Sequence, residues 1–126
     1  MLAVGSSKGI LLWNVHERRK VSLFTEHASP VFQIHFSPDG ILLASIGKDG
    51  AVRLWNGDDW ASVQILGQST CFRSYRGGLA FHPNAYILAT LGQSGNIVRI
   101  WELDITSLFN CGNQSLVGES ADFALT

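Results

Sequence analysis

The sequence has few cysteines, few charges and no long apolar run, and each shortage excludes a class of protein. Only 2 cysteines occur among 126 residues. Cys71 and Cys111 are isolated, so the sequence indicates neither a disulfide framework nor a zinc site. No apolar run approaches the roughly 20 residues that a membrane-spanning helix needs, and the start of the chain lacks the features of a signal peptide. We therefore expect a cytoplasmic protein that does not bind membranes.

Charge is also scarce, at 15% of the residues, with 9 Lys and Arg against 10 Asp and Glu. A net charge of -1 argues against generic nucleic-acid binding, which depends on a basic surface. The one basic cluster, Arg18 to Lys20, is typical of a solvated turn. The 4 histidines are scattered, with no carboxylate or cysteine at ligand spacing. We expect neither a metal nor a cofactor.

What the sequence does contain is a motif that recurs three times and ends in tryptophan. LAVGSSKGILLW ends at Trp13, LASIGKDGAVRLW at Trp55 and LATLGQSGNIVRIW at Trp101, so the tryptophans are 42 and 46 residues apart. A period near 40 to 45 with short alternating strands is that of a four-stranded propeller blade. Shorter helical repeats would show helical apolar spacing, which this chain lacks.

The middle repeat shows the strand pattern most clearly. Residues Val31 to Phe36 alternate as a strand, SPDG forms a turn, and Ile41 to Ser45 form a second strand. After the turn GKDG, Ala51 to Trp55 form a third strand, and Ser62 to Leu66 form a fourth. The sequence therefore predicts an all-β chain of four-stranded antiparallel sheets.

The stretch from Glu26 to Asn56 resembles a WD-repeat β-propeller blade. It has a histidine before the first strand, a Ser-Pro-Asp-Gly turn, an Asp-Gly turn and a terminal tryptophan, and weaker copies extend the resemblance over roughly the first hundred residues. In that family a His, a Ser or Thr, an Asp and a Trp form a hydrogen-bonded network inside the blade. The resemblance implies that this network consists of His27, Ser45, Asp49 and Trp55.

The chemistry of these side chains suits such a network. A buried indole N–H needs an acceptor, which the Ser45 hydroxyl can provide, and Asp49 can hold the His27 imidazole. The same Ser, His and Asp also suggest a hydrolase triad. Because no Gly-x-Ser-x-Gly elbow surrounds Ser45, we favour the structural interpretation and expect no enzyme activity.

The other two repeats keep less of this set. The third has Phe72, Thr90 and Ser94 at the positions of the histidine, serine and aspartate, and the first has Val4 and Lys8 at those of the serine and aspartate. The distance from glycine to tryptophan also grows along the chain, which suggests a bulge or a lengthened turn near residue 96. Only the middle repeat is expected to form the complete network.

Length limits the number of repeats. A propeller closes with about four to eight blades, on the order of 160 residues or more. We therefore expect a partial propeller of about two to three blades over residues 1–103, with units of about 1–25, 26–67 and 68–103. The first unit lacks its first strand. Residues 104–126 leave the repeat and lack the Gly-Lys-Ser/Thr of a phosphate-binding loop, so we expect a linker or a frayed tail there.

The resemblance implies a protein-interaction scaffold or sensor module, a fragment of a larger WD-repeat propeller. The alternative is a regulatory fragment of a signalling NTPase whose catalytic domain lies outside this chain. Partners would be other proteins, and we expect self-association or completion by further blades, because an open arc exposes strand edges. Five residues in loops of one rim are candidates for partner binding: Ser29, Lys48, Arg73, Tyr75 and Gln93.

Overall fold

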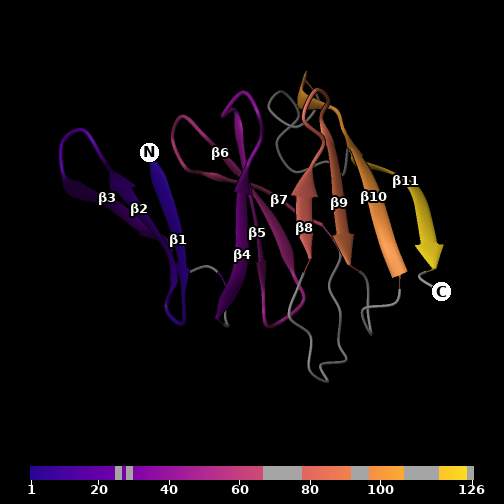
Figure 1. The fold of residues 1–126 in the computed structure, drawn as a ribbon, viewed down its shortest axis with the longest axis horizontal. Helices are drawn as coiled ribbons and strands as arrows, with labels where there is room; N and C mark the ends of the chain where they lie inside the picture. The colour runs from indigo at the N-terminus through magenta and orange to yellow at the C-terminus, as the bar shows by residue number, and fades with distance from the viewer. Residues whose placement is uncertain (25–26, 28–29, 67–77, 92–96, 107–116, 125–126) are drawn as a thin grey trace.

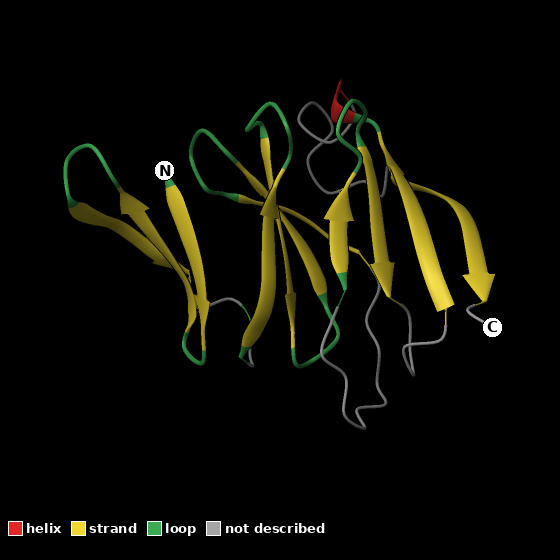
Figure 2. Ribbon diagram, viewed as in Figure 1, coloured by secondary structure: helices red, strands yellow, loops and turns green. Residues whose placement is uncertain are grey.

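The computed structural model consists of three antiparallel sheets that lie side by side (Figure 1). Figure 2 shows that strands joined by short turns make up almost all of the described chain. The structure describes residues 1–24, 27, 30–66, 78–91, 97–106 and 117–124. The predicted all-β class is confirmed, and the sheets have three or four strands each, as a partial propeller requires.

The strands follow one another along the chain, and each pairs with its neighbours in sequence. Sheet I contains β1 (Leu2–Ser6), β2 (Gly9–Asn14) and β3 (Arg19–Phe24). Sheet II contains β4 (Val31–Phe36), β5 (Leu42–Gly47), β6 (Val52–Asn56) and β7 (Ser62–Leu66). Sheet III contains β8 (Leu79–Phe81), β9 (Ile87–Leu91), β10 (Ile97–Leu103) and β11 (Val117–Ala124).

The turn between β4 and β5 shows how the sequence sets the start of a strand. The amide of Leu42 donates to the Ser37 hydroxyl oxygen at 2.9 Å, and that hydroxyl donates to Asp39 at 2.7 Å. Gly40 has φ of 77°, a left-handed conformation that glycine adopts without steric cost. The second strand of this sheet therefore begins at Leu42, one residue later than the predicted Ile41.

Two apolar layers hold the sheets together. Between sheets I and II, Ile10 and Leu12 pack in one cluster with Val31, Leu43 and Trp55. Between sheets II and III, a second cluster contains residues from both sheets: Leu42, Ala44, Ile46, Val52, Leu54, Leu66, Leu79, Leu88, Trp101 and Leu103. Because side chains alternate across a strand, sheet II contributes one face to each layer.

Each sheet has a β-bulge at its tryptophan. The register shifts between Leu12 and Trp13, between Leu54 and Trp55, and between Ile100 and Trp101, each time where the tryptophan strand pairs with the strand that follows it. In all three sheets the extra residue lies on that following strand, and such a bulge locally increases the twist. The repeat is therefore one of backbone geometry as well as of sequence. The bulge or lengthened turn expected near residue 96 lies outside the described residues.

The structure differs from the sequence-based expectation in residues 104–126. Part of that stretch, expected to be a linker or a frayed tail, is β11, which pairs with β10 from Ile97↔Ala124 to Leu103↔Val117. The physical reason is that β10 has one edge on β9 and needs a second partner for the backbone groups on its other edge. Strand β11 gives sheet III the same four-stranded order as sheet II.

Candidate functional site

The predicted polar set lies inside sheet II, on the side that faces sheet I. Ser45 is on β5, Trp55 is on β6, and His27 precedes β4. The Trp55 indole nitrogen donates to the Ser45 hydroxyl oxygen at 3.0 Å, and His27 Nε2 lies 2.7 Å from the same oxygen. His27 is 5% exposed and Ser45 is 0% exposed. The structure thus brings three of the four predicted residues into one hydrogen-bonded chain.

Asp49 stands at the outer end of this chain. Its Oδ1 lies 3.8 Å from His27 Nδ1, which is longer than a hydrogen bond, and it accepts the amide N–H of Ala51 at 3.2 Å. Its side chain is less buried than that of His27. Asp49 therefore acts on the imidazole through charge, across a short gap.

The protonation of His27 follows from these neighbours. Burial lowers the pKa of His27, and the positive charge of Arg53 lowers it further, while Asp49 opposes both effects. The net shift is downward, so the imidazole is neutral near pH 7. The Ser45 hydroxyl has one proton and two lone pairs, so it can accept from Trp55 and still hydrogen-bond with His27 Nε2.

This order of serine, histidine and aspartate is that of a hydrolase triad, but the serine and the histidine are buried. The Ser45 hydroxyl is fully buried, and both of its hydrogen-bonding neighbours are protein side chains. Phe24 of β3 stacks on Trp55, with ring centroids 4.9 Å apart and planes 11° apart. The geometry suits a fixed link between β5, β6 and the segment that enters β4.

Sheet III contains the same hydrogen bond between a tryptophan indole and a hydroxyl group. Trp101 donates its indole N–H to Thr90 Oγ1 at 3.0 Å, and both residues are buried. Phe72 and Ser94, at the positions of the histidine and aspartate, lie outside the described residues. In sheet I, Val4 takes the place of the hydroxyl residue, and Trp13 is 37% exposed.

Of the five residues predicted to form a partner-binding rim, the structure describes one. Lys48 is exposed in the turn between β5 and β6, where its amide donates to the Pro30 carbonyl at 2.7 Å. This backbone bond ties the turn to the segment that precedes β4. Ser29, Arg73, Tyr75 and Gln93 lie outside the described residues.

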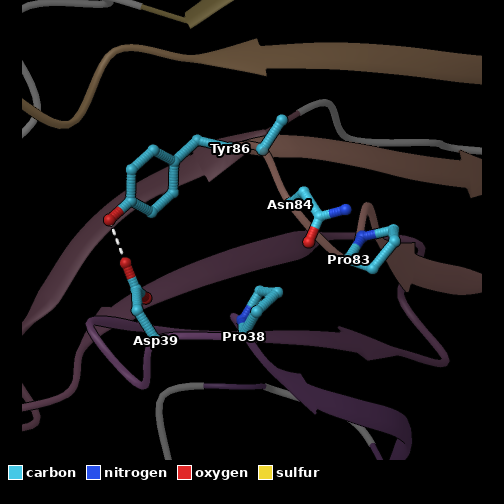
Figure 3. Close-up of a pocket in the computed structure, with 6 residues that line it drawn as sticks. Pro38, Asp39, Pro83, Asn84 and Tyr86 are labelled. Carbon is cyan, nitrogen blue, oxygen red and sulfur yellow. Dashed lines mark hydrogen bonds between the residues drawn. The ribbon is translucent and has the colours of Figure 1, made fainter.

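A groove that the sequence analysis missed lies at the opposite rim, between sheets II and III (Figure 3). It has a volume of about 400 Å³ and is lined by Pro38, Asp39, Pro83, Asn84, Ala85 and Tyr86. The first two residues belong to the turn between β4 and β5, and the other four to the turn between β8 and β9. The shared Phe-x-Pro of FSPDG and FHPNA could have shown that the two turns are equivalent.

One side-chain contact spans this groove. The Tyr86 hydroxyl donates to Asp39 Oδ2, while Asp39 Oδ1 accepts from the Ser37 hydroxyl and from the Ile41 amide (Figure 3). Burial raises the pKa of Asp39, but the hydrogen bonds from Tyr86, Ile41 and Ser37 outweigh it and hold that pKa below its ordinary value. The hydrogen bond to Asp39 raises the pKa of the Tyr86 hydroxyl. The groove is thus bordered by a carboxylate.

In the described part of the chain, no group of three or more His, Cys, Asp or Glu side chains could hold a metal ion. None of the helical structure described there is long and apolar enough to cross a membrane.

The repeated indole–hydroxyl pair, the repeated bulge and the row of antiparallel sheets define the β-propeller class of fold. Comparison with known families agrees: residues 18–56 match the WD domain, G-beta repeat. The match runs from the start of β3 to the end of β6, so it joins the last strand of sheet I to three strands of sheet II. The WD-repeat resemblance is confirmed.

Curated relatives support the same assignment. The chain is 30% identical over 105 residues to small ribosomal subunit protein RACK1 of Caenorhabditis elegans, across 82% of this chain and 30% of that protein. It is 33% identical over 87 residues to small ribosomal subunit protein RACK1z of Arabidopsis thaliana, across 69% of this chain and 25% of that protein. These alignments span less than a third of either relative.

Proposed function

We propose that this chain is a non-catalytic scaffold module of the cytoplasm, one part of a larger WD-repeat propeller, and that it binds other proteins through the turns at its rims. The observation that carries the proposal is the burial of Ser45, whose oxygen contacts only protein partners in the network with His27 and Trp55. The side chains of Ser45 and His27, which could take part in catalysis, connect parts of the fold instead.

The comparisons favour this function over the alternative that the sequence left open. The family match is a WD repeat, and both relatives are RACK1 proteins. Nothing in these matches supports a regulatory fragment of a signalling NTPase. We therefore set that alternative aside.

The groove between Pro38 and Tyr86 is the described surface best suited to a partner. Its lining comes from two turns that are held by backbone bonds, Ser37 N to Leu42 O and His82 N to Ile87 O, both 2.8 Å long. A partner that binds there would order few side chains, because proline is rigid and Tyr86 is already held by Asp39. Tyrosine is also common among the residues that dominate binding energy.

The opposite rim remains a second candidate. Lys48 is exposed there, and the sequence predicts that Ser29, Arg73, Tyr75 and Gln93 share this rim with it. The two rims lie at opposite ends of β5, so a variant in one leaves the other intact. This separation allows the two surfaces to be tested independently.

The test uses purified small ribosomal subunits as the probe, since both relatives are named as proteins of that subunit. Co-sedimentation of the 126-residue chain is measured for the wild type, for Ala85→Arg in the groove, for Lys48→Glu at the other rim, and for Ile65→Thr on exposed β7 as the control. We expect one rim variant to weaken binding about tenfold or more. Binding of the ribosomal subunit through these rims would be contradicted if the chain failed to sediment, or if both rim variants bound like the control.

A further inference from the structure

The groove between sheets II and III has a carboxylate in its wall whose charge is not balanced. Asp39 accepts hydrogen bonds from the hydroxyl groups of Tyr86 and Ser37 and from the amide of Ile41. These three donors are neutral, so they orient the carboxylate and leave its negative charge in place. Within the described part of the chain, Asp39 forms no ion pair. The groove therefore offers a fixed negative charge to whatever enters it.

The neighbouring turn of sheet II adds to this charge. The Gly57 amide donates to the Ile41 carbonyl at 2.8 Å, which places the turn between β6 and β7 beside the turn that contains Asp39. This neighbouring turn carries Asp58 and Asp59, and both are exposed. Lys and Arg are absent from the three described turns of sheets II and III at this rim, residues 37–41, 57–61 and 82–86.

Sheet III contributes no described cation at its end of the groove. Glu102 is exposed on β10, opposite Ile87, the residue that follows Tyr86. His82 Nδ1 accepts the amide N–H of Asn84 at 3.0 Å, so this nitrogen carries no proton and the imidazole is neutral. The described charges around the groove are thus negative on both sides.

The basic residues of the chain lie elsewhere. Arg18 to Lys20 are at the same rim but on sheet I, which packs on the other face of sheet II. Lys8 and Lys48 are exposed at the opposite rim. A positively charged segment is therefore attracted to the groove between sheets II and III and repelled by the described lysines of the other rim.

The rest of the lining is apolar and flat. Pro38, Pro83, Ala85 and the ring of Tyr86 form most of it, and Figure 3 shows Tyr86 reaching from its own turn toward Asp39. The volume of about 400 Å³ is near the lower end of the roughly 300 to 1,000 Å³ of small-molecule sites. The groove is therefore suited to single side chains of a partner.

We propose that this groove binds an arginine side chain from a basic segment of a partner protein, which rests on the proposed function of the chain as a protein-binding module. Charge complementarity selects this occupant, because a neutral or acidic segment would cover Asp39 without pairing its charge. The apolar stem of arginine packs on proline, and its planar guanidinium stacks on an aromatic ring and bonds to a carboxylate. Lysine supplies the charge without the planar group.

The experiment follows the backbone amides of the isotope-labelled 126-residue chain by NMR. The probe is the blocked peptide Gly-Ser-Arg-Gly-Arg-Ser-Gly, and its match has citrulline, which keeps the shape of arginine without the charge. We expect the arginine peptide to produce saturable shifts in residues 37–41 and 82–86 and to leave the Lys48 amide in place. The citrulline peptide should produce no saturable shift.

Two matched variants separate the groove from the general charge of the rim. Asp39→Asn should raise the Kd for the arginine peptide about tenfold or more, because it removes a charged hydrogen-bond acceptor. Asp58→Asn makes the same change of charge at an exposed position outside the groove and should raise the Kd about threefold or less. Asn84→Lys places a cation in the groove and should also weaken binding, and it replaces Asp39→Asn if the spectrum shows that variant to be misfolded.

Three outcomes overturn this proposal: no saturable shift, equal weakening by Asp39→Asn and Asp58→Asn, or equal binding of the citrulline peptide. None of these contradicts the proposed function, which stands if Ala85→Arg still weakens co-sedimentation with the ribosomal subunit. Conversely, a chain that binds the arginine peptide in the groove and fails to sediment contradicts only the binding of that subunit.

Discussion

Trp55 donates its indole N–H to the hydroxyl oxygen of Ser45 across two paired strands, at 3.0 Å. Trp101 and Thr90 of sheet III are related in the same way and at the same distance. An indole buried in an apolar layer needs one acceptor, and the hydroxyl on the neighbouring strand provides it. The tryptophan that ends each motif can therefore be buried where a serine or threonine accompanies it.

Removal of the Ser45 hydroxyl tests this dependence. Ser45→Ala leaves the Trp55 indole and His27 Nε2 without their partner, so we expect the free energy of unfolding to fall by about 1 to 3 kcal/mol. Urea unfolding followed by tryptophan fluorescence measures the loss. Ser62→Ala, at an exposed position of β7, is the control and should change little. Equal losses at the two positions would contradict the role of Ser45.

The lowered pKa of His27 predicts how stability depends on pH. The unfolded histidine binds its proton near pH 6.5, whereas the folded one binds it only at a lower pH. The unfolded state thus holds more protons between these two values, and stability falls as the pH falls through that window. Denaturant unfolding at pH 7.5 and 5 measures the loss.

The His27→Gln variant identifies the histidine as the source of this pH dependence. It should flatten the pH dependence below pH 6.5, because glutamine does not titrate. Asp39 also has a lowered pKa, but its ordinary value is 3.8, so its contribution is lost only in more acidic solution. If wild type and variant lose stability in parallel between pH 7.5 and 5, His27 is not buried in its neutral form.

The groove contact is tested through the titration of Asp39. Tyr86→Phe removes one of the hydrogen bonds that lower its pKa, so the Asp39 pKa should rise toward its ordinary value. Bonds from Ser37 and Ile41 remain and should keep the shift incomplete. Carbon-detected NMR of the Asp39 carboxyl group measures the change. An unchanged pKa would show that Tyr86 does not bond to Asp39 in solution.

Two glycines at the same rim should differ in their response to alanine. A Cβ at Gly57 would lie 2.1 Å from the Gly40 carbonyl oxygen, a backbone atom that cannot turn aside. A Cβ at Gly40 would meet nothing within 4 Å, and its cost comes only from its φ of 77°, about 1 to 2 kcal/mol. We expect Gly57→Ala to destabilise the protein more than Gly40→Ala. Thermal unfolding of both variants decides the order.

The sequence predicted sheet II well because its signals are local. These signals lie close together along the chain. The alternation from Val31 to Phe36 indicates a strand, Gly40 indicates a turn, and Trp55 ends the motif. Ser45 and His27 could also be predicted as partners. The WD-repeat resemblance assigns them to the family's network, and their side chains can form a hydrogen bond with each other.

Two features could not be found in this way. Strand β11 is separated from β10 by a stretch outside the repeat pattern, and only its pairing with the outer edge of β10 assigns it to sheet III. The groove depends on two turns that are distant in sequence, and the bond between Tyr86 and Asp39 joins residues that no local pattern connects. Both features arise from the packing of one repeat on the next.

We propose that the polar set of sheet II links parts of the fold and does not act on a substrate. The most direct test is incubation of the native protein with a fluorophosphonate, which labels activated serines, followed by mass spectrometry of the peptide that contains Ser45. We expect no adduct on Ser45, because its hydroxyl is fully buried and held by Trp55 and His27. An adduct on Ser45 that disappears in the His27→Ala variant, with the fold retained, would contradict it.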